Sequence, residues 1–330
     1  MGIEDEPPPI DPPPDPPPDL PRWYFNEEEN EAGLKQIEAG QDFGNVLMGT
    51  VGGWIKDESS LSIEGTCWVA DDAQVFDNAT VADDAVVSGN AILKDNVKVY
   101  GSALIEDSVV VSDNAEVYNQ AHLSGSVKVS GNAKIYDDAI VADNSSVSGH
   151  AEIYGSAKVS GSSRVREYAQ VFDDAIVVSS SFEYDSVDIY ENAKIYGSAL
   201  VHGNAKIYGN ANVFGNSQVY FKSKIYGNAK VYGYAHIFCD AQVYGDSQVY
   251  GSAFVYSVSK ILGYAKVFEN AKVFGEAIVL GNSMVFGSSL VYGDAIVTDY
   301  AQVSGYARIY NNGVVNGNTQ VWGDTLVYGT

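Results

Sequence analysis

The sequence predicts an all-β fold, a single-stranded parallel β-solenoid of about 15 coils with 18 residues in each coil. The first observation is a six-residue repeat: of the 45 sixth positions from Ile63 to Val327, 44 hold Val, Ile or Leu and only Glu183 departs. The second is that the fifth place of the repeat holds a small residue, mostly Ala or Ser. The third is that the third and fourth places are rich in Gly, Asp, Asn and Ser, which favour tight turns.

A period of six is not helical, so each repeat is interpreted as a short strand followed by a corner. Because side chains alternate along a strand, the fifth and first places point inward and the sixth and second places point outward. Three repeats then close a triangular coil filled by Val, Ile and Ala. No insertion is evident from Ile63 to Val327. We therefore expect one continuous rod, roughly 70 Å long at about 4.8 Å per coil.

The unit from Ile225 to Lys230, Ile-Tyr-Gly-Asn-Ala-Lys, resembles the hexapeptide repeat of the left-handed β-helix superfamily, over about four fifths of the chain. The resemblance implies a left-handed triangular β-helix, although ordinary parallel crossovers are right-handed. Its best-known members are acyltransferases, but a fold alone does not imply a function. The stretch from Asp42 to Val69 also resembles the start of uncharacterised hexapeptide-repeat proteins of enterobacteria and bacteriophages, described as transferases or structural proteins.

Three segments are expected along the chain. Residues 1–21 form an acidic tail that holds all ten prolines, a composition typical of a disordered or polyproline II spacer. Residues 22–62 form an N-terminal capping segment, in which Asn26 and the glutamates after it predict a helix of about ten residues ending at Gly40. Residues 63–330 form the hexapeptide-repeat solenoid.

The composition limits the partners that we expect. With 43 acidic and 19 basic residues the net charge is −24, which disfavours nucleic acid and anionic membranes. No apolar run approaches the length of a membrane span, so no membrane insertion is expected. We expect synthesis in the cytoplasm, followed by incorporation in a virion or a surface assembly. Cys67 and Cys239 lie many coils apart and are expected to be free thiols.

Residues eighteen apart are expected to stack into columns on the outer faces. One predicted column holds nine consecutive aromatic rings, which would stabilise the strand ladder or form a contact surface for a partner chain or for sugar rings. This column comprises Tyr100, Tyr118, Tyr136, Tyr154, Phe172, Tyr190, Tyr208, Tyr226 and Tyr244.

Apolar outward residues gather toward the two ends of the predicted rod. They are Trp68, Val86, Leu104, Ile140, Ile278, Leu290, Ile296, Val314 and Leu326. The last coil ends at Thr330 without a visible cap, which would leave an open strand edge. We therefore expect a protein partner or self-assembly through the apolar columns and the last coil, with a glycan as a further possible ligand.

Acyltransferases with this repeat use a general base, usually His, and commonly a loop that leaves the coil. The four histidines are His122, His150, His202 and His236. None adjoins an inserted loop in the predicted arrangement, and no three share a coil or column, so no catalytic residue, metal site or cofactor is assigned. His122 is the best candidate for a base if the chain is an enzyme.

The expected function is a non-enzymatic structural rod, part of a phage tail, fibre or decoration or of a surface assembly, tethered by its N-terminal tail. One alternative is an acyltransferase-like enzyme with a site between subunits at His122. The other is a carbohydrate-binding solenoid that uses the column from Tyr100 to Tyr244. At Glu183 the inner column breaks, and we expect a bulge that turns this carboxylate outward.

Overall fold

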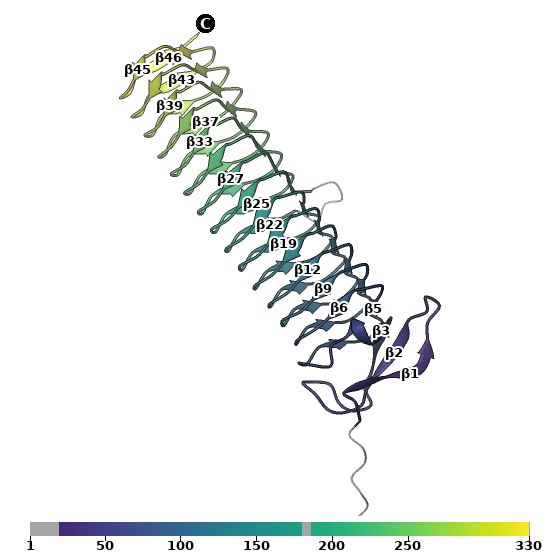
Figure 1. Cartoon of the computed structure of the whole chain (residues 1–330). Helices are drawn as coiled ribbons and strands as arrows, with labels where there is room; N and C mark the ends of the chain where they lie inside the picture. The colour runs from purple at the N-terminus through teal and green to yellow at the C-terminus, as the bar shows by residue number, and fades with distance from the viewer. Residues whose placement is uncertain (1–19, 180–185, 330) are drawn as a thin grey trace, which may run out of the picture.

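The computed structural model describes residues 20–179 and 186–329 and is a parallel β-solenoid that forms one straight rod (Figure 1). Each coil contributes one short strand to each of three faces. One face has 15 strands, which corresponds to 15 coils. The predicted all-β solenoid fold is therefore confirmed. Within the described residues the only helical turn is the 3-10 helix η1 (Glu58–Ser60).

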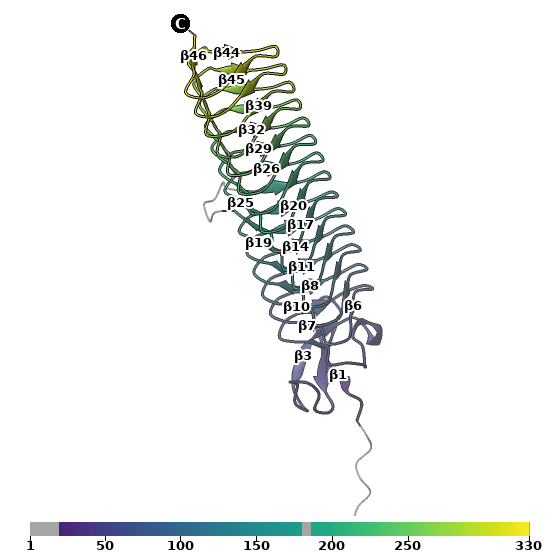
Figure 2. The same ribbon diagram turned by 90° about the vertical axis from the view of Figure 1, so that its left-hand side faces the viewer.

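Each face is one sheet of parallel strands along the rod (Figure 2). Face 1 consists of β4 (Trp68–Val69), β7 (Val86–Val87), β10 (Leu104–Ile105), β13 (His122–Leu123), β16 (Ile140–Val141), β19 (Lys158–Ser160), β22 (Ile176–Val178), β25 (Leu200–His202), β28 (Gln218–Val219), β31 (His236–Ile237), β34 (Phe254–Val255), β37 (Lys272–Val273), β40 (Leu290–Val291), β43 (Arg308–Tyr310) and β46 (Leu326–Tyr328). Face 2 consists of β5 (Gln74–Val75), β8 (Ile92–Leu93), β11 (Val110–Val111), β14 (Lys128–Val129), β17 (Ser146–Val147), β20 (Arg164–Val165), β23 (Asp188–Ile189), β26 (Lys206–Ile207), β29 (Lys224–Ile225), β32 (Gln242–Val243), β35 (Lys260–Ile261), β38 (Ile278–Val279), β41 (Ile296–Val297) and β44 (Val314–Val315). Face 3 consists of β6 (Thr80–Val81), β9 (Lys98–Val99), β12 (Glu116–Val117), β15 (Lys134–Ile135), β18 (Glu152–Ile153), β21 (Gln170–Val171), β24 (Lys194–Ile195), β27 (Asn212–Val213), β30 (Lys230–Val231), β33 (Gln248–Val249), β36 (Lys266–Val267), β39 (Met284–Val285), β42 (Gln302–Val303) and β45 (Gln320–Val321).

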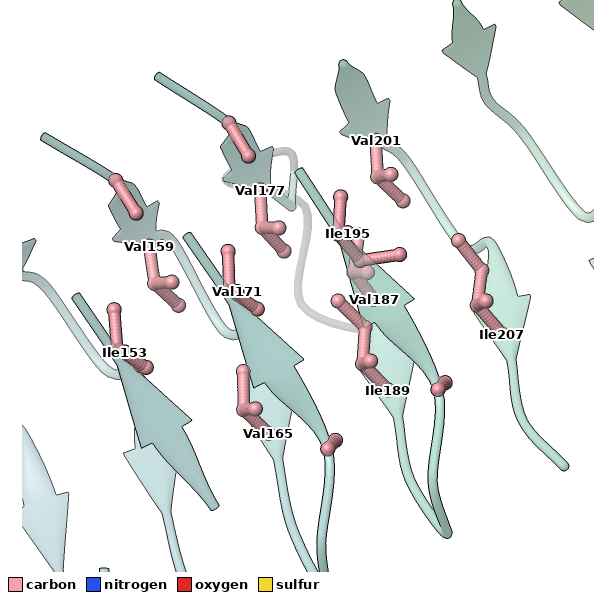
Figure 3. Packing of buried hydrophobic residues seen from close by; sticks show 14 of the residues in the cluster. Ile153, Val159, Val165, Val171, Val177, Val187, Ile189, Ile195, Val201 and Ile207 are labelled. Carbon is pink, nitrogen blue, oxygen red and sulfur yellow. The ribbon is translucent and has the colours of Figure 1, made fainter. Parts of the chain in front are cut away.

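The core is the interior of the prism, filled by the first and fifth places of the repeats (Figure 3). Ile153 and Val171 are fully buried, as are the alanines that precede them. Each such Val or Ile side chain contributes roughly 1.5–3 kcal/mol by leaving water. Backbone hydrogen bonds join successive coils, as where the Val86 amide donates to the Ala103 carbonyl at 2.9 Å. Burial and backbone pairing therefore both act between neighbouring coils.

The corners explain why Asp shares the third place of the repeat with Gly. The backbone there is left-handed, with φ of +58° at Asp83 and +63° at Asp113. The Asp83 carboxylate accepts the Gly101 amide of the next coil at 2.9 Å, and Asp113 accepts the Gly131 amide at 2.7 Å. Gly adopts this backbone freely, whereas Asp offsets its cost by bonding the coil above it.

The N-terminal cap is made of strands, so the predicted helix ending at Gly40 is wrong. The strands β1 (Trp23–Glu29) and β2 (Lys35–Ala39) form an antiparallel hairpin, and β2 pairs in turn with β3 (Val51–Ile55). Asn30 closes the hairpin, because its side-chain oxygen accepts the amides of Ala32 and Leu34, each at 3.0 Å. These bonds form a turn where a helix would need continuous backbone pairing.

The first coil begins earlier than the repeat count indicates. Ile55 of β3 lies beside Val75, and Leu61 lies beside Val81, so these neighbours are 20 residues apart instead of 18. Ile63 is 74% exposed, although it occupies a sixth position in the sequence count. The inward residues of the first coil are therefore Ile55 and Leu61, and the sequence count missed both of them.

A register step interrupts the rod in its middle. Ile153 pairs with Val171 after 18 residues, but Val171 pairs with Ile195 after 24, and Val165 likewise pairs with Ile189 after 24. From Ile189 onward the spacing is again 18, as in its pairing with Ile207. One six-residue repeat thus contributes no strand pair to the sheets, and the expectation of an uninterrupted series of repeats is wrong. Glu183 and its predicted bulge lie outside the described residues.

This step makes a direct prediction. Ser179 occupies the third place of its repeat and Ser186 the fourth place of the next. Deleting residues 180–185 therefore joins a third place to a fourth, as in every other repeat, and we expect the melting temperature to change by less than about 3 °C. Deleting residues 205–207 removes the fully buried Ala205 and Ile207 and is not a whole repeat, so it disrupts the inward places that follow and should melt far lower. Equal losses in the two variants, measured by circular dichroism, would contradict the register.

Candidate functional site

His122 lies on face 1 at the first residue of β13, and its side chain meets a carboxylate of the preceding coil. Its Nε2 atom is 2.8 Å from Oε1 of Glu106, the residue that follows β10. Both side chains are partly exposed, 34% for His122 and 38% for Glu106. The pair forms because a second place in one coil and the sixth place of the next lie side by side on one face. The predicted base candidate therefore has a carboxylate partner.

The surroundings of His122 combine apolar side chains with a hollow. Leu104 and Ile140 are its direct neighbours in the ladder, as the sequence predicted, and both are half-buried. A surface hollow of about 570 Å³ lies along the corner that leads into β13, and Gln120 is part of its lining. Gln120 precedes His122 by two residues in the chain, so the hollow adjoins the strand that carries the imidazole.

The other histidines differ from His122. His236 is at the same place on face 1 but stacks on Phe254, with ring centres 4.7 Å apart. His202 pairs with Val178 across the register step, so the argument that no histidine adjoins an interruption is wrong for this residue. Burial lowers the pKa of both His202 and His236 below the ordinary histidine value. His150 lies at a corner and stacks on Tyr168 at 4.9 Å.

The register step also changes the aromatic columns, and the predicted column of nine rings is divided. Phe172 stacks on Tyr196 at 4.8 Å, and not on Tyr190, which begins another column on face 2. The face 3 column comprises Tyr100, Tyr118, Tyr136, Tyr154, Phe172, Tyr196, Phe214, Tyr232, Tyr250, Phe268 and Phe286. The face 2 column comprises Tyr190, Tyr208, Tyr226 and Tyr244.

The rings in these columns lie almost parallel, as between Tyr100 and Tyr118, whose planes differ by 1° at 4.9 Å. Each ring face is therefore covered by its neighbours, and mainly ring edges remain for a ligand. Sugars bind aromatic residues mostly through the ring face, so the columns favour the stabilising role. Binding of a glycan or a partner chain at these residues stays a prediction.

Among residues 20–179 and 186–329, no three His, Cys, Asp or Glu side chains are grouped so that they could hold a metal ion. The same part of the chain contains no helix with the length and apolar character of a membrane span. The thiols of Cys67 and Cys239 are both free.

Comparison with known proteins gives three similarities. The profile of a family described as the YdcK Beta solenoid repeat matches residues 73–92. An Escherichia coli (strain K12) protein named "Uncharacterized acetyltransferase YdcK" is 53% identical over 38 residues, which are 12% of this chain and 12% of that protein. The crystal structure of Francisella novicida UDP-N-acetylglucosamine acyltransferase has 16% identity over 66% of each chain and a TM-score of 0.31. The matched part thus spans about an eighth of the E. coli relative.

These similarities correct the functional expectation. The prediction that the chain is not an enzyme is contradicted, because the relative in E. coli carries the name of an acetyltransferase. The hexapeptide-repeat solenoid is confirmed by the family match. The expected role as a phage or surface rod receives no support from any of the three similarities.

The stacked tyrosines predict a loss of stability at alkaline pH. Burial, together with the charges of nearby acidic groups, raises the pKa of Tyr118 to about 12, against about 10 in an unfolded chain. Because the pKa of Tyr118 is higher in the folded protein than in the unfolded chain, its contribution to the stability of the fold is complete below about pH 10. That contribution is lost as the pH rises toward about 12. Tyr118→Phe should reduce the fall in melting temperature between pH 9.5 and 11.5. An unchanged fall would contradict this assignment.

The two thiols should react at different rates. Burial raises the pKa of Cys67 to about 11, and its Sγ atom lies 3.4 Å from the Ser62 carbonyl. Cys239 is half-buried at a corner and lines a surface hollow. With a disulfide reagent at pH 8 we expect one rapid equivalent of thiol, which Cys239→Ser removes and Cys67→Ser leaves. Rapid reaction of Cys67 in the folded protein would show that the cap is open.

Proposed function

The chain belongs to the hexapeptide-repeat left-handed β-helix superfamily, and on this premise we propose that it is an acyltransferase-like enzyme with His122 as its general base. The single observation that carries the proposal is the 2.8 Å contact between His122 and Glu106 on an outer face of the solenoid. The acetyltransferase name of the E. coli relative supports the reaction class. The identity of the acyl group and of its acceptor is left open.

The contact with Glu106 selects the form of the imidazole that suits a base. A carboxylate accepts hydrogen bonds, so Nε2 of His122 carries the hydrogen and donates a hydrogen bond to Oε1 of Glu106. Nδ1 then keeps its lone pair and is available to an acceptor substrate. Glu106 is a positioning residue, because it orients the ring and stabilises the imidazolium that forms during the reaction.

The reaction that this arrangement supports is transfer of an acyl group from a thioester to a hydroxyl or an amine. Nδ1 of His122 takes the proton of the acceptor as its oxygen or nitrogen attacks the thioester carbon. The carbon–sulfur bond breaks, and the thiolate takes the proton back from His122. Proton transfer by a positioned base contributes about 10²–10⁴ to the rate of such a step.

Face 1 is open around His122, so a second surface has to exclude water from the reaction. We assign this role to a second copy of the chain. Leu104 and Ile140 point outward on either side of His122, and Val86 lies next to Leu104 in the same sheet. All three are only half-buried, which supports an apolar contact at this face. The site would then lie between subunits, with the corner hollow near Gln120 as the entrance for a substrate.

Thiol release from acetyl-coenzyme A, measured over a panel of amine and hydroxyl acceptors, tests the proposal. His122→Gln should lower the turnover number by at least about a hundredfold. Glu106→Gln should lower it less, and should change the pH profile because the imidazolium loses its counter-charge. The matched control is His236→Gln, since this residue has the same place on the same face but stacks on Phe254.

The control separates chemistry from folding. All three variants should keep the circular dichroism spectrum and melting temperature of the parent protein, because each replaces a partly exposed side chain. Activity that falls equally in the His122→Gln and His236→Gln variants would contradict the assignment of the base. Activity that survives His122→Gln undiminished would also overturn it.

A further inference from the structure

A cationic hollow occurs in this strongly acidic chain. Of the 19 lysine and arginine residues, Arg164, Lys206, Lys222 and Lys224 line one hollow of about 400 Å³. It lies where the corner after face 1 leads into face 2, and it spans the register step, because Arg164 precedes the step and the three lysines follow it. Asp240 is the only carboxylate among the described residues of the lining. The hollow therefore attracts anions although the whole chain carries a net charge of −24.

Two of these lysines lie on consecutive rungs of the ladder. Lys206 pairs directly with Lys224 in the strand register of face 2. Face 3 avoids this arrangement, because Glu116 lies between Lys98 and Lys134, at 3.9 Å and 3.6 Å from their ammonium groups. Like charges placed directly opposite each other destabilise a sheet, so the Lys206 and Lys224 pair costs stability unless an anion lies between the two side chains.

No carboxylate in the described part of the chain forms an ion pair with Lys206, Lys222 or Lys224. Asp188 pairs with Lys206 in the strand register, but its side chain is only 8% exposed and bonds to Arg166 at 3.1 Å and 3.2 Å. It also lies 3.6 Å from Arg164, so it partly neutralises that residue of the lining. The charge of Asp188 is thus already compensated. Within residues 20–179 and 186–329, the three ammonium groups therefore keep no carboxylate partner.

An aromatic ring borders the same hollow. Phe221 is 56% exposed and lines a second hollow of about 370 Å³, which shares Lys222 and Asp240 with the first. Its backbone φ is +57°, a conformation that costs a bulky residue about 1–2 kcal/mol. Most other corners hold Gly, Asp, Asn or Glu at this place. The ring lies 5.3 Å from that of Tyr220, and its exposure gives the two adjoining hollows an apolar wall beside their cationic side chains.

We propose that this corner is a binding site for a nucleoside diphosphate. The ammonium groups of Lys206 and Lys224 hold the two phosphates, and Lys222 closes the hollow from the corner. The base lies on the ring of Phe221, since an aromatic side chain beside a cationic groove binds a base by stacking. Lys206 lies four coils beyond His122, and Phe221 and Lys224 lie five coils beyond it, so the site does not depend on acyl transfer. Free nucleotides and larger molecules that contain a nucleoside diphosphate share this chemistry.

Isothermal titration calorimetry with ADP, inorganic pyrophosphate and adenosine tests the proposal on the full-length chain. ADP should bind with one site per chain, pyrophosphate more weakly, and adenosine not measurably. Raising the salt from 50 to 300 mM should weaken ADP and pyrophosphate, because charge dominates both complexes. Coenzyme A, which contains the same diphosphate, distinguishes a carrier-borne ligand from a free nucleotide if it binds more tightly than ADP and loses this gain in the Lys206→Gln, Lys224→Gln variant, because acetyl-coenzyme A is also the donor proposed for the site at His122.

Variants identify the residues. The double variant Lys206→Gln, Lys224→Gln should weaken ADP and pyrophosphate at least about tenfold. Phe221→Gly should weaken ADP by a similar factor and leave pyrophosphate within about twofold, since only the base loses its contact. Phe221→Gly should also melt no lower than the parent, because glycine adopts φ of +57° without strain. Lost affinity in this variant would thus not be a loss of folding.

The control is the double variant Lys98→Gln, Lys134→Gln, which removes two charges from face 3. It should bind ADP as the parent does. Equal weakening in this control would overturn the proposal, because general charge would then explain the binding. The absence of ADP and pyrophosphate binding at 50 mM salt would also overturn it. An unchanged ADP affinity in the Phe221→Gly variant would exclude base stacking and with it a nucleotide.

Discussion

The contact between one coil and the next is the constraint on which this structure depends. Each coil buries its Val, Ile and Ala residues against the coil below and bonds to it through backbone amides and carbonyls. A neighbour is therefore defined by its position in the stack, and a shift by one repeat moves every later residue to another face. The site at His122 and the cationic hollow at Lys206 follow from these positions, because the described residues named at both sites belong to the coils themselves.

The fold was predictable from the sequence because the inward places obey one strict rule, but the register step was not. The step spans six residues, which equals one repeat, so counting every sixth position continues across it unchanged. Glu183 was the one sequence signal, as the only acidic residue in an otherwise aliphatic column. The assumption of an unbroken stack then displaced every later column, and it placed Phe172 beside Tyr190 instead of Tyr196.

The candidate sites were likewise predictable only where they do not depend on the register step. Before the step, the neighbours of His122 in the ladder were predicted correctly, and its contact with Glu106 could have been found, because residues 16 apart adjoin on one face. The pairing of Lys206 with Lys224 could also have been found, since they are 18 residues apart, but the position of Arg164 beside them could not, because it depends on the step. The strands of the N-terminal cap were not predicted, because the cap lies outside the repeats and its apolar residues fit a helix. The side chain of Asn30 instead forms a turn at this point, which makes a hairpin.

Engineered disulfides test the register most directly. Cysteines placed at Phe172 and Tyr196 should form a disulfide under mild oxidation, because adjacent strands lie about 4.8 Å apart and a disulfide needs Cα atoms within about 7 Å. Cysteines at Phe172 and Tyr190 should stay reduced in the folded protein. Both pairs are to be made in a Cys67→Ser, Cys239→Ser background and read by mass spectrometry. Bridging of the Phe172 and Tyr190 pair, with none between Phe172 and Tyr196, would contradict the account.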